Sequence, residues 1–579
     1  MTEMPMPAGT LKPGTGDSAV RARTALVVES FDLERILLTV RGRVDGDASS
    51  LVGVRAYFVD STGGERYEAG ELALSGATFT LRSRIMHVAG GKPLHTGRWR
   101  LVLADEAALA NQEAADDVAA GRTDTDVERA EREAFGEPIW MDDAFRIDPH
   151  DYSGLFTYGR VRYWMVPSID RITGGFALAI SYRLNKSKAP RGWRRLTRIM
   201  HSTGSHIRNV AFHGSIGFVR RLVPHNGKRI LFTSDSRREI SGNLLHIYER
   251  MCERGLDRKY TLMRVFKESI KTRRSLIDKF RIVYGLAVAD VILLDDYQPM
   301  LYKVGFAPET KIIQVWHASG AFKTVGYSRI GKSGGPEPFS SAHKIYTHAI
   351  VNSEYDIPYY AEAFGIPEDR VHATGIPRTD LFFDEAERRA ASERAYEGFP
   401  CARGKQTILF APTFRGKGPS DAHYDFEAVD LDGLYTVCEE LDACVIFKHH
   451  PFVLDVPEIP QRFSDRFVDA TDNREINDIL MISDLVITDY SSLVFEYSTL
   501  GRPMIFFAYD LEEYEATRDF YEPLVAFAPG KIVRTFDELL AAIRSGDFEQ
   551  EKVAEFAARH FTHTDGRSSD RVIDEIVLG

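Results

Sequence analysis

Short hydrophobic runs alternate with turn residues over the first third of the chain. Runs such as RILLTVRGRV, VGVRAYFVD and GRWRLVLAD place apolar side chains at roughly every second position, and Gly, Asp and Ser separate the runs. This period is typical of strands that bury one face. The pattern predicts a β-rich, sandwich-like domain over residues 23–185, with a partly open barrel as the alternative architecture.

Two segments of this region lack the alternation. Residues 1–22 are rich in Pro and Gly and indicate a disordered tail. An acidic, Ala-rich stretch near residues 104–137 interrupts the strands, and we expect a solvated helix or a loose insert there. The β-rich region contains no recognisable catalytic motif, so we expect it to serve in binding or in bracing the rest of the chain.

The basic segment at residues 186–227 has a different pattern. Trp193, Leu196, Met200 and Ile207 recur at helical spacing among many Lys and Arg, without one Asp or Glu. A basic amphipathic stretch is typical of a membrane surface, because each cation near anionic lipid contributes about 1 kcal/mol. We expect this segment to associate with an anionic membrane. A linker helix packed on a neighbouring domain is the alternative.

From residue 228 onward, buried-strand runs alternate with helical patterns. KRILFTS, YTLMRVF, VADVILLDD and ETKIIQVWH form one series, and a second series begins near residue 350 with HAIVNS. Repeated strand–helix units predict parallel, doubly wound sheets. We therefore expect an α/β fold with two Rossmann-like domains in tandem, at residues 228–349 and 350–579.

Composition narrows the class of protein. A chain of 579 residues with 44% apolar side chains is too long for one core, and its net charge of −11 argues against nucleic-acid binding. No apolar run is long enough for a spanning helix, and the first residues lack the pattern of a secretion signal. Four scattered cysteines fit a reducing compartment. We expect a cytoplasmic, multidomain protein.

Polar residues gather where the predicted strands end. Because the carboxyl ends of parallel strands meet at one edge of a sheet, we expect these residues to line a cleft between the two domains. The clusters are residues 314–323, 375–380, 411–415, 448–451 and 488–492.

One of these clusters suggests a phosphate site. Ser491 and Ser492 precede a predicted helix, whose first-turn N–H groups favour an anionic group. Arg378, Arg415 and Lys448 lie at other strand ends, and together with the serines they predict a diphosphate seat. Ordinary helix capping by serine is the alternative. The sequence offers no metal-ligand spacing, so we expect no metal ion and no cofactor.

Two histidines are candidates for proton transfer. His317 follows a strand of the first domain, and an imidazole that titrates near neutral pH can take a proton from an attacking hydroxyl. His450 lies beside the predicted phosphate seat, where it would donate hydrogen bonds or, when charged, offset negative charge. His449 alternates to the other face of its strand, so we expect a structural role for it.

Five separated motifs occur in order along the chain: QVWHASGAFKTVG, GIPRTD, APTFR, KHHP and NDILMISDLVITDYSSLVFEYSTLGRPMIFF. Together they resemble those of the CDP-glycerol glycerophosphotransferases, the teichoic-acid primase and polymerase family. The resemblance covers about residues 228–521 and implies GT-B-like tandem Rossmann domains on the cytoplasmic face of the cell membrane, held there peripherally. It implies transfer of glycerol phosphate, or a related alditol phosphate, from CDP-glycerol or another CDP-alditol to a lipid-linked or polymeric acceptor, with release of CMP.

The resemblance also implies roles for single residues. His317 and His450 match the two essential histidines of the family. Many members read Trp-His-Gly-Thr-Pro where this chain has Ala318 and Ser319 after the histidine, in a loop near the acceptor. Substrate contact is therefore expected at those two positions, and the choice of alditol stays open. A further set is expected around the nucleotide diphosphate or a turn beyond it: Arg378, Pro412, Thr413, Ser491, Ser492 and Glu496.

Other interpretations remain. A P-loop match, GYSRIGKS at residues 326–333, is followed by GGPEP, which is unfavourable to the helix that such a loop must open. A GT-B glycosyltransferase that uses a nucleotide sugar for cell-surface polysaccharide is the closest alternative, because fold alone does not separate attack at carbon from attack at phosphorus. An inactive membrane-bound scaffold is the third. The sequence does not distinguish primase from polymerase.

Overall fold

A computed structural model describes residues 24–60, 65–104, 137–141, 154–158, 161–170, 175–184, 209–269, 272–332, 335–416, 421–473 and 476–579. The predicted tail, nearly all of the acidic insert and residues 186–208 of the basic segment lie outside these ranges. The chain divides into two compact units. One consists of Met1–Thr197 with Val325–Lys344, and the other of Arg198–Thr324 with Ile345–Gly579.

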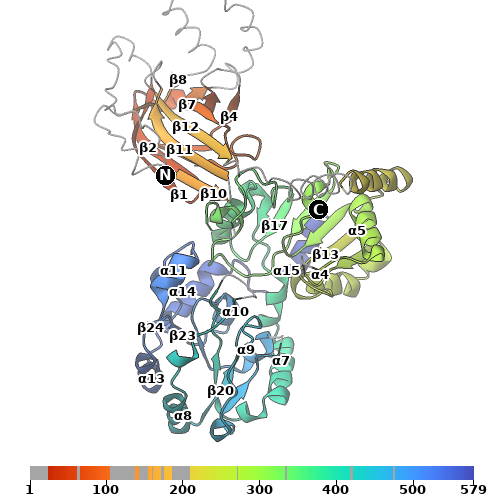
Figure 1. Ribbon diagram of the computed structural model, residues 1–579, viewed down its shortest axis with the longest axis vertical. Helices are drawn as coiled ribbons and strands as arrows, with labels where there is room; N and C mark the ends of the chain where they lie inside the picture. Colours follow the sequence, from red (N-terminus) through yellow and green to blue (C-terminus); the bar gives the residue numbers. More distant parts are fainter. Residues whose placement is uncertain are drawn as a thin grey trace, which may run out of the picture. The chain divides into compact units, whose positions relative to one another are not determined.

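The first unit contains two β-sheets, drawn in red to orange in Figure 1. Their strands are mainly antiparallel, as the alternating pattern led us to expect, although the short pair β1–β9 is parallel. The first sheet has the order β5 (Glu71–Ser75), β6 (Thr78–Arg84), β2 (Leu37–Asp45), β1 (Ala25–Glu34), β9 (Trp140–Met141). The second has the order β10 (Gly154–Tyr158), β11 (Val161–Ile169), β12 (Phe176–Leu184), β7 (Gly97–Ala104), β3 (Arg55–Asp60), β4 (Arg66–Glu68), with β8 (Glu137–Pro138) beside β7.

One hydrophobic core serves both sheets of this unit. Leu38 of β2 and Leu101 of β7 belong to the same buried cluster. Tyr327 and Ile330 also belong to it, although they come from the segment Val325–Lys344, far away in sequence. The predicted domain at residues 228–349 therefore differs from the structure, because twenty of its residues fold with the β-rich unit.

The second unit begins with a six-stranded parallel sheet. Its strand β13, RILFTS, is buried almost throughout, as expected for a parallel strand with both faces covered. Its helices are α4 (Gly242–Glu253), α5 (Leu276–Val288) and α6 (Ile357–Phe364). The strand order is β14 (Thr261–Phe266), β13 (Arg229–Ser234), β15 (Val291–Leu294), β16 (Lys311–Gln314), β17 (His348–Ile350), β18 (Val371–His372).

A second six-stranded parallel sheet follows. The strand order is β21 (Phe467–Asp469), β20 (Ala443–Phe447), β19 (Gln406–Phe410), β22 (Leu485–Thr488), β23 (Met504–Phe507), β24 (Lys531–Val533). Its helices and those after it are α7 (Glu385–Gly398), α8 (Leu431–Glu440), α9 (Ile476–Ile482), α10 (Leu493–Ser498), α11 (Leu511–Thr517), α12 (Leu524–Phe527), α13 (Phe536–Ser545), α14 (Glu551–His560) and α15 (Ser568–Arg571).

The boundary between the two sheets is not where the sequence placed it. β17 pairs with β16 and β18 pairs with β17, so the strands near residue 350 complete the first sheet instead of opening the second. The last residues also return to the first sheet. Val572 and Ile576 share a core with Ile230, and Asp570 pairs with Arg250 of α4 at 2.8 Å. Figure 1 shows α15 beside α4.

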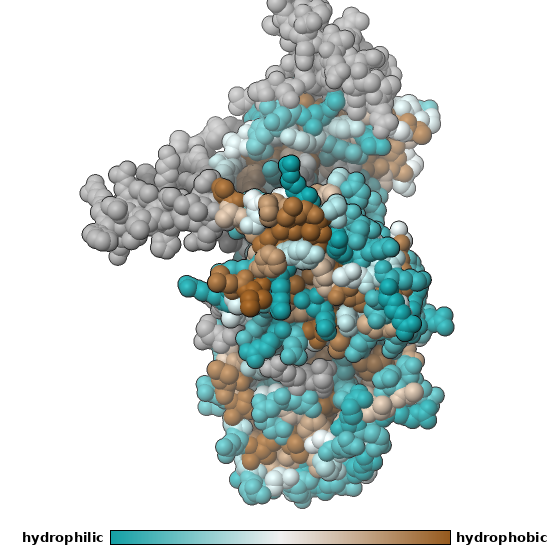
Figure 2. All heavy atoms as spheres, turned by 90° about the vertical axis from the view of Figure 1, so that its right-hand side faces the viewer, coloured by the Kyte–Doolittle hydropathy of each residue, from teal (hydrophilic) through white to brown (hydrophobic). Residues whose placement is uncertain are grey.

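Several exposed hydrophobic side chains lie on α5 and on the helical residues 209–222 of this unit. Leu276, Ile277 and Phe280 of α5 are 66–82% exposed, and Phe218 and Leu222 of the helical residues 209–222 are both 64% exposed. Figure 2 shows hydrophobic side chains among hydrophilic ones on the face that carries α5. None of the helices within the described ranges is long and apolar enough to cross a membrane.

Arg220 of the basic segment contacts the α/β unit. Its guanidinium donates to the carbonyl oxygens of Gly305 and Ala287 at 2.6 and 3.3 Å. Burial lowers the pKa of this side chain. Helix 209–222 is therefore fixed to the α/β unit by Arg220, as the alternative interpretation of a packed linker helix predicts for this part of the segment.

Candidate active site

The loop after β16 carries His317 and starts in a strained conformation. Trp316 is buried with φ of +49°, a left-handed conformation that costs a non-glycine residue about 1–2 kcal/mol. The amide of Asn243, in the first turn of α4, donates to the carbonyl oxygens of Val315 and Trp316, both at 2.9 Å. Its Oδ1 accepts the backbone N–H of Arg378 at 3.1 Å. Asn243 thus fixes two candidate site segments at once.

His317 is exposed, and a backbone hydrogen bond orients its ring. Nδ1 lies 3.0 Å from the carbonyl oxygen of Asp295, just after β15. A carbonyl oxygen can only accept a hydrogen bond, so Nδ1 carries the proton and Nε2 presents a lone pair. This tautomer is the one that a general base acting through Nε2 requires.

The carboxyl group of Asp295 is buried near this histidine. One of its oxygens lies 2.5 Å from Nε of Arg237. Burial raises the pKa of Asp295, although the nearby charges of Arg237 and His317 act in the opposite direction. The ion pair holds the residue whose carbonyl oxygen orients the imidazole of His317.

Two predicted site residues, Ser319 and Arg378, contact the buried carboxylate of a third, Glu496. Ser319 Oγ donates to Oε1 of Glu496 at 2.8 Å, and Arg378 forms an ion pair with the same oxygen. Glu496 is 2% exposed, whereas the Arg378 side chain is 26% exposed. The His317 loop, the turn at Arg378 and helix α10 are therefore joined, and the Arg378 side chain remains partly accessible.

The rest of this loop is held by close packing. Gly320 has φ of +65°, and a Cβ atom there would lie 2.0 Å from the ring of Phe495 in α10. Tyr360 Oη donates to the carbonyl oxygen of Gly320 at 2.9 Å, and Ala321 N–H donates to Asp356 at 3.1 Å. Glycine is required at residue 320 both by its dihedral angle and by the approach of the aromatic ring.

His450 lies in a cationic environment after β20. Burial lowers its pKa to about 4, and Lys323, Lys448 and Arg518 add to this effect. Nδ1 accepts the backbone N–H of Phe452 at 3.2 Å, so Nε2 carries the proton of the neutral ring. His450 is thus a neutral hydrogen-bond donor at pH 7. Of the two roles expected for it, this favours donation of a hydrogen bond over neutralisation of negative charge by a charged ring.

The two residues before His450 are more enclosed. Lys448 Nζ donates to the carbonyl oxygen of Thr471 at 3.1 Å, and burial lowers the pKa of this amine. His449 is 6% exposed beside the rings of Phe426 and Tyr424. Burial lowers the pKa of His449 to about 4. Its packing is that of a core residue.

The loop after β19 is organised around Asp489. Thr413 donates from its N–H and its Oγ1 to Asp489 Oδ1, at 2.8 and 2.9 Å, and Pro412 before it is buried. Arg415 pairs with Asp489 at 2.7 Å and with Asp510 at 2.6 Å. Burial alone would lower the pKa of Arg415, but Asp489 and Asp510 raise it above the ordinary value.

Aromatic rings complete the enclosure of Arg415. Four rings lie 5.1–5.5 Å from its guanidinium carbon, those of Tyr424, Tyr490, Tyr509 and Tyr514. The side chain is only 10% exposed. Its hydrogen-bonding groups are committed to two carboxylates, so this geometry argues against the phosphate-binding role that the sequence suggested for Arg415.

Ser491 and Ser492 lie between β22 and α10, and both are partly exposed. Ser492 makes no capping hydrogen bond through its side chain, and Ser491 Oγ accepts from Leu493 N at 3.4 Å. Helix α10 has only six residues. A phosphate at this position would therefore depend on the hydroxyl and N–H groups of the turn more than on a long helix dipole.

Sequence reasoning missed the supporting residues of the site. Asn243, Asp295 and Asp356 are polar residues with 0–1% exposure. In the sequence each stands next to an apolar residue, and this was the one signal available for them. The P-loop-like residues 326–333 begin with a 3₁₀ turn, Gly326–Arg329, within the β-rich unit. Within the described ranges, no three His, Cys, Asp or Glu side chains group closely enough to hold a metal ion.

Two parallel, Rossmann-like sheets with polar side chains after the carboxyl ends of their strands are features of α/β enzymes that bind nucleotides. A family model, CDP-Glycerol:Poly(glycerophosphate) glycerophosphotransferase, matches residues 216–578. The chain belongs to this family, and the resemblance noted in its sequence is confirmed. It is therefore an enzyme of the phosphotransferase class.

Known relatives agree with this assignment. The teichoic acid ribitol-phosphate polymerases TarK and TarL of Staphylococcus aureus (strain NCTC 8325 / PS 47) are 48% and 46% identical to it. The alignments cover 65% and 71% of this chain and 73% and 74% of the relatives. The solved structure of the wall teichoic acid polymerase TagF has a TM-score of 0.53 at 21% identity, over 66% of this chain and 97% of TagF. That likeness shows a shared α/β fold.

Proposed function

We propose that the protein transfers ribitol phosphate from CDP-ribitol to a hydroxyl at the end of a growing teichoic-acid chain. Family membership supports the reaction class, and the names of the two relatives support ribitol over glycerol and a polymerase over a primase. The sequence analysis left the donor open between CDP-glycerol and another CDP-alditol, and this proposal takes the second, CDP-ribitol.

The hydrogen bond between His317 Nδ1 and the carbonyl oxygen of Asp295 carries this proposal. Nε2 takes the proton of the acceptor hydroxyl, whose oxygen attacks the β-phosphorus of the donor. A new phosphorus–oxygen bond forms, the diphosphate bond breaks, and CMP leaves with the bonding electrons. General base catalysis of this kind contributes typically 10²–10⁴-fold to the rate.

Charge on the departing CMP is stabilised by the second half of the unit. His450 donates from Nε2 in the neighbourhood of Lys323, Lys448 and Arg518, which together form an electropositive environment. Preorganised donors of this kind are worth about 2.7–4 kcal/mol each when they face developing charge. The remaining contacts to the diphosphate and the acceptor are assigned to Arg378, Ala318, Ser319, Pro412, Thr413, Ser491 and Ser492, with Glu496 holding Arg378 and Ser319 in place.

The proposal includes a GT-B-like arrangement and a peripheral position at the cytoplasmic membrane surface. Exposed Leu276, Ile277 and Phe280 of α5 support membrane contact, because apolar groups flanked by cations such as Lys279 and Arg281 favour an anionic bilayer surface. Co-sedimentation with anionic vesicles tests this part, and protein that stays in the supernatant at low salt would contradict it. The β-rich unit is an accessory, sandwich-like domain in this proposal.

The test of the reaction offers CDP-ribitol, CDP-glycerol and a UDP-sugar separately, with a synthetic lipid-linked acceptor. Release of CMP from CDP-ribitol with products of many repeats is the expected result. Release of UDP with sugar transfer would instead establish the glycosyltransferase alternative, and single-unit addition would establish a primase.

A further inference from the structure

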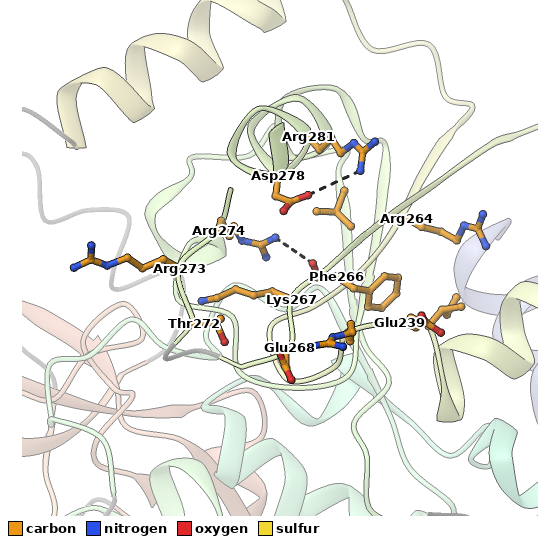
Figure 3. A pocket seen from close by; sticks show the side chains of 13 residues that line it. Glu239, Arg264, Phe266, Lys267, Glu268, Thr272, Arg273, Arg274, Asp278 and Arg281 are labelled. Carbon is orange, nitrogen blue, oxygen red and sulfur yellow. Dashed lines mark hydrogen bonds and ion pairs between the residues drawn. The ribbon is translucent and has the colours of Figure 1, made fainter. Parts of the chain in front are cut away.

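A cavity of about 550 Å³ opens beside the carboxyl end of β14, in the first sheet of the α/β unit (Figure 3). Three acidic side chains, Glu239, Glu268 and Asp278, contribute to its lining. Six cationic side chains also line it, twice the number of acidic ones, and the sequence analysis gave none of these six a role. The six are Arg238, Arg264, Lys267, Arg273, Arg274 and Arg281.

The interior of this cavity is fixed and its rim is exposed. Arg274, whose side chain is 5% exposed, pairs with Asp235 and donates to the carbonyl oxygen of Phe266. By contrast, Arg238 meets Glu268 at 3.1 Å in a pair with side chains 76% and 57% exposed. Exposed pairs contribute about 0.2–1 kcal/mol, so Arg238 can turn to another anion at little cost.

The cavity lies on the same edge of the sheet as His317. The neighbouring strands β14, β13, β15 and β16 are parallel, so their carboxyl ends face the same way. With strands about 4.8 Å apart, three spacings separate the end of β14 from the end of β16 by roughly 15 Å. Asp235 pairs with Arg274 of the cavity lining. Arg237, two residues further on, pairs with Asp295, whose carbonyl oxygen orients His317.

We infer that this cavity binds a phosphodiester group of the acceptor polymer, behind the hydroxyl that reacts by the roughly 15 Å that separates the two strand ends. The inference rests on the proposed function, because an alditol-phosphate polymer carries one negative charge per repeat. A strand of such a polymer lying along the carboxyl edge of the sheet reaches both the cavity and His317. Guanidinium groups suit this ligand, since they hold phosphate oxygens through paired N–H donors.

The test removes two rim cations by the double substitution Arg238→Gln with Arg273→Gln. The matched control is Arg258→Gln with Lys259→Gln, which removes the same charge from exposed positions before β14, at the opposite edge of the sheet. Each variant is assayed with an acceptor of one repeat and with one of about twenty repeats. Direct binding of the long polymer, without donor, is measured in parallel.

We expect the rim variant to bind the long polymer roughly tenfold more weakly and to raise its KM by a similar factor. Its kcat and KM with the short acceptor and its KM for CDP-ribitol should equal those of the wild type. Polymer binding should weaken with salt less steeply in the rim variant than in the control, since fewer counterions are released.

Several results would overturn the inference. These are unchanged polymer binding in the rim variant, an equal loss in the control, or an equal rise in KM for the short acceptor. Loss of binding to phosphatidylglycerol vesicles with normal polymer binding would assign the cavity to lipid headgroups instead. A wild-type protein that binds polymer but releases no CMP would refute the proposed function alone.

Discussion

At the scale of single residues, the two candidate histidines are held in opposite tautomers. His317 Nδ1 donates a hydrogen bond to the carbonyl oxygen of Asp295, whereas His450 Nδ1 accepts one from the backbone N–H of Phe452. Nε2 is therefore an acceptor in the first ring and a donor in the second. One imidazole is suited to take a proton and the other to bind an anion, although the residue type is the same.

Replacing His317 tests the first of these roles. His317→Asn should lower kcat by about 10²–10⁴-fold because the general base is lost, while donor affinity stays near the wild-type value. CMP release and binding of CDP-ribitol are the two measurements. His563→Asn, at a partly buried histidine for which no catalytic role is proposed, is the control. A kcat within a factor of three of the wild type would refute the role of His317.

The buried histidines also predict how stability depends on pH. Burial lowers the pKa of His348, His449 and His450 to about 4, below the ordinary value of 6.5. Between pH 6.5 and 4 the unfolded chain binds protons that the folded chain does not. The free energy of unfolding should therefore fall as the pH falls through this window, by up to about 1.4 kcal/mol per pH unit for each group.

Denaturant unfolding at pH 7, 6 and 5 measures this effect. His449→Gln removes one titrating group from the core, so its unfolding free energy should fall less between pH 6 and 5 than that of the wild type. The change above pH 6.5 should be the same for both proteins. Equal slopes in the acidic window would show that His449 does not contribute.

Single-residue patterns led to candidate residues more readily than to the residues that support them. The sequence singled out His317, Ser319 and Glu496, because each stands in a polar motif after an apolar run, and the structure joins Ser319 and Glu496 by a hydrogen bond. It did not identify Asn243, whose amide links three backbone groups from distant segments. Arg415 shows what a local pattern leaves out. A cation at a strand end suggested a phosphate ligand, and in the structure its partners are two carboxylates that folding brings near.

At the scale of elements, the His317 loop and helix α10 depend on a glycine. Gly320→Ala places a methyl group against the ring of Phe495 and also strains a backbone with φ of +65°. Gly501→Ala is a matched control, because Gly501 has the same φ and nothing within 4 Å of its missing Cβ. We expect both to lose stability of about 1 kcal/mol from the dihedral angle, with a further 1–3 kcal/mol only at Gly320.

Thermal unfolding and kcat distinguish the two glycine variants. Gly320→Ala should also lower kcat, because the loop must move away from α10 and take His317 with it. Gly501→Ala should leave kcat unchanged. Equal effects of the two substitutions on both measurements would mean that the contact with Phe495 is not what positions the loop.

The sequence predicted which segments form strands better than it predicted which strands pair with one another. The buried runs of β13 and β19 were correctly taken as parallel strands, because continuous apolar residues suit a sheet covered on both faces. The same local pattern occurs in β17, and nothing in it says which sheet it joins. Its pairing with β16 is a long-range choice, so the predicted boundary near residue 350 was wrong.

At the scale of the whole molecule, the two units are interleaved in sequence. Val325–Lys344 leaves the α/β unit directly after the His317 loop, folds with the β-rich unit and returns before β17. Phe339 packs on Tyr163 and Tyr182 there, and Lys344 donates to the carbonyl oxygen of Met86 at 3.4 Å. Burial lowers the pKa of Lys344 to about 7. The β-rich unit therefore includes a segment that lies, in sequence, between two parts of the α/β unit.

Tyr327→Ala tests whether the β-rich unit depends on this segment. Tyr327 is fully buried in the core of the β-rich unit and donates to the carbonyl oxygen of Ser340, so its loss should destabilise that unit by about 3–5 kcal/mol. Hydrogen exchange resolved by segment should then accelerate in β2, β7 and β12. Tyr346→Ala, at a fully buried tyrosine of the other unit, should accelerate exchange in β15 and β16 instead. If Tyr327→Ala instead accelerated exchange in β15 and β16 and left exchange in β2 unchanged, Val325–Lys344 would stabilise the α/β unit and not the β-rich unit.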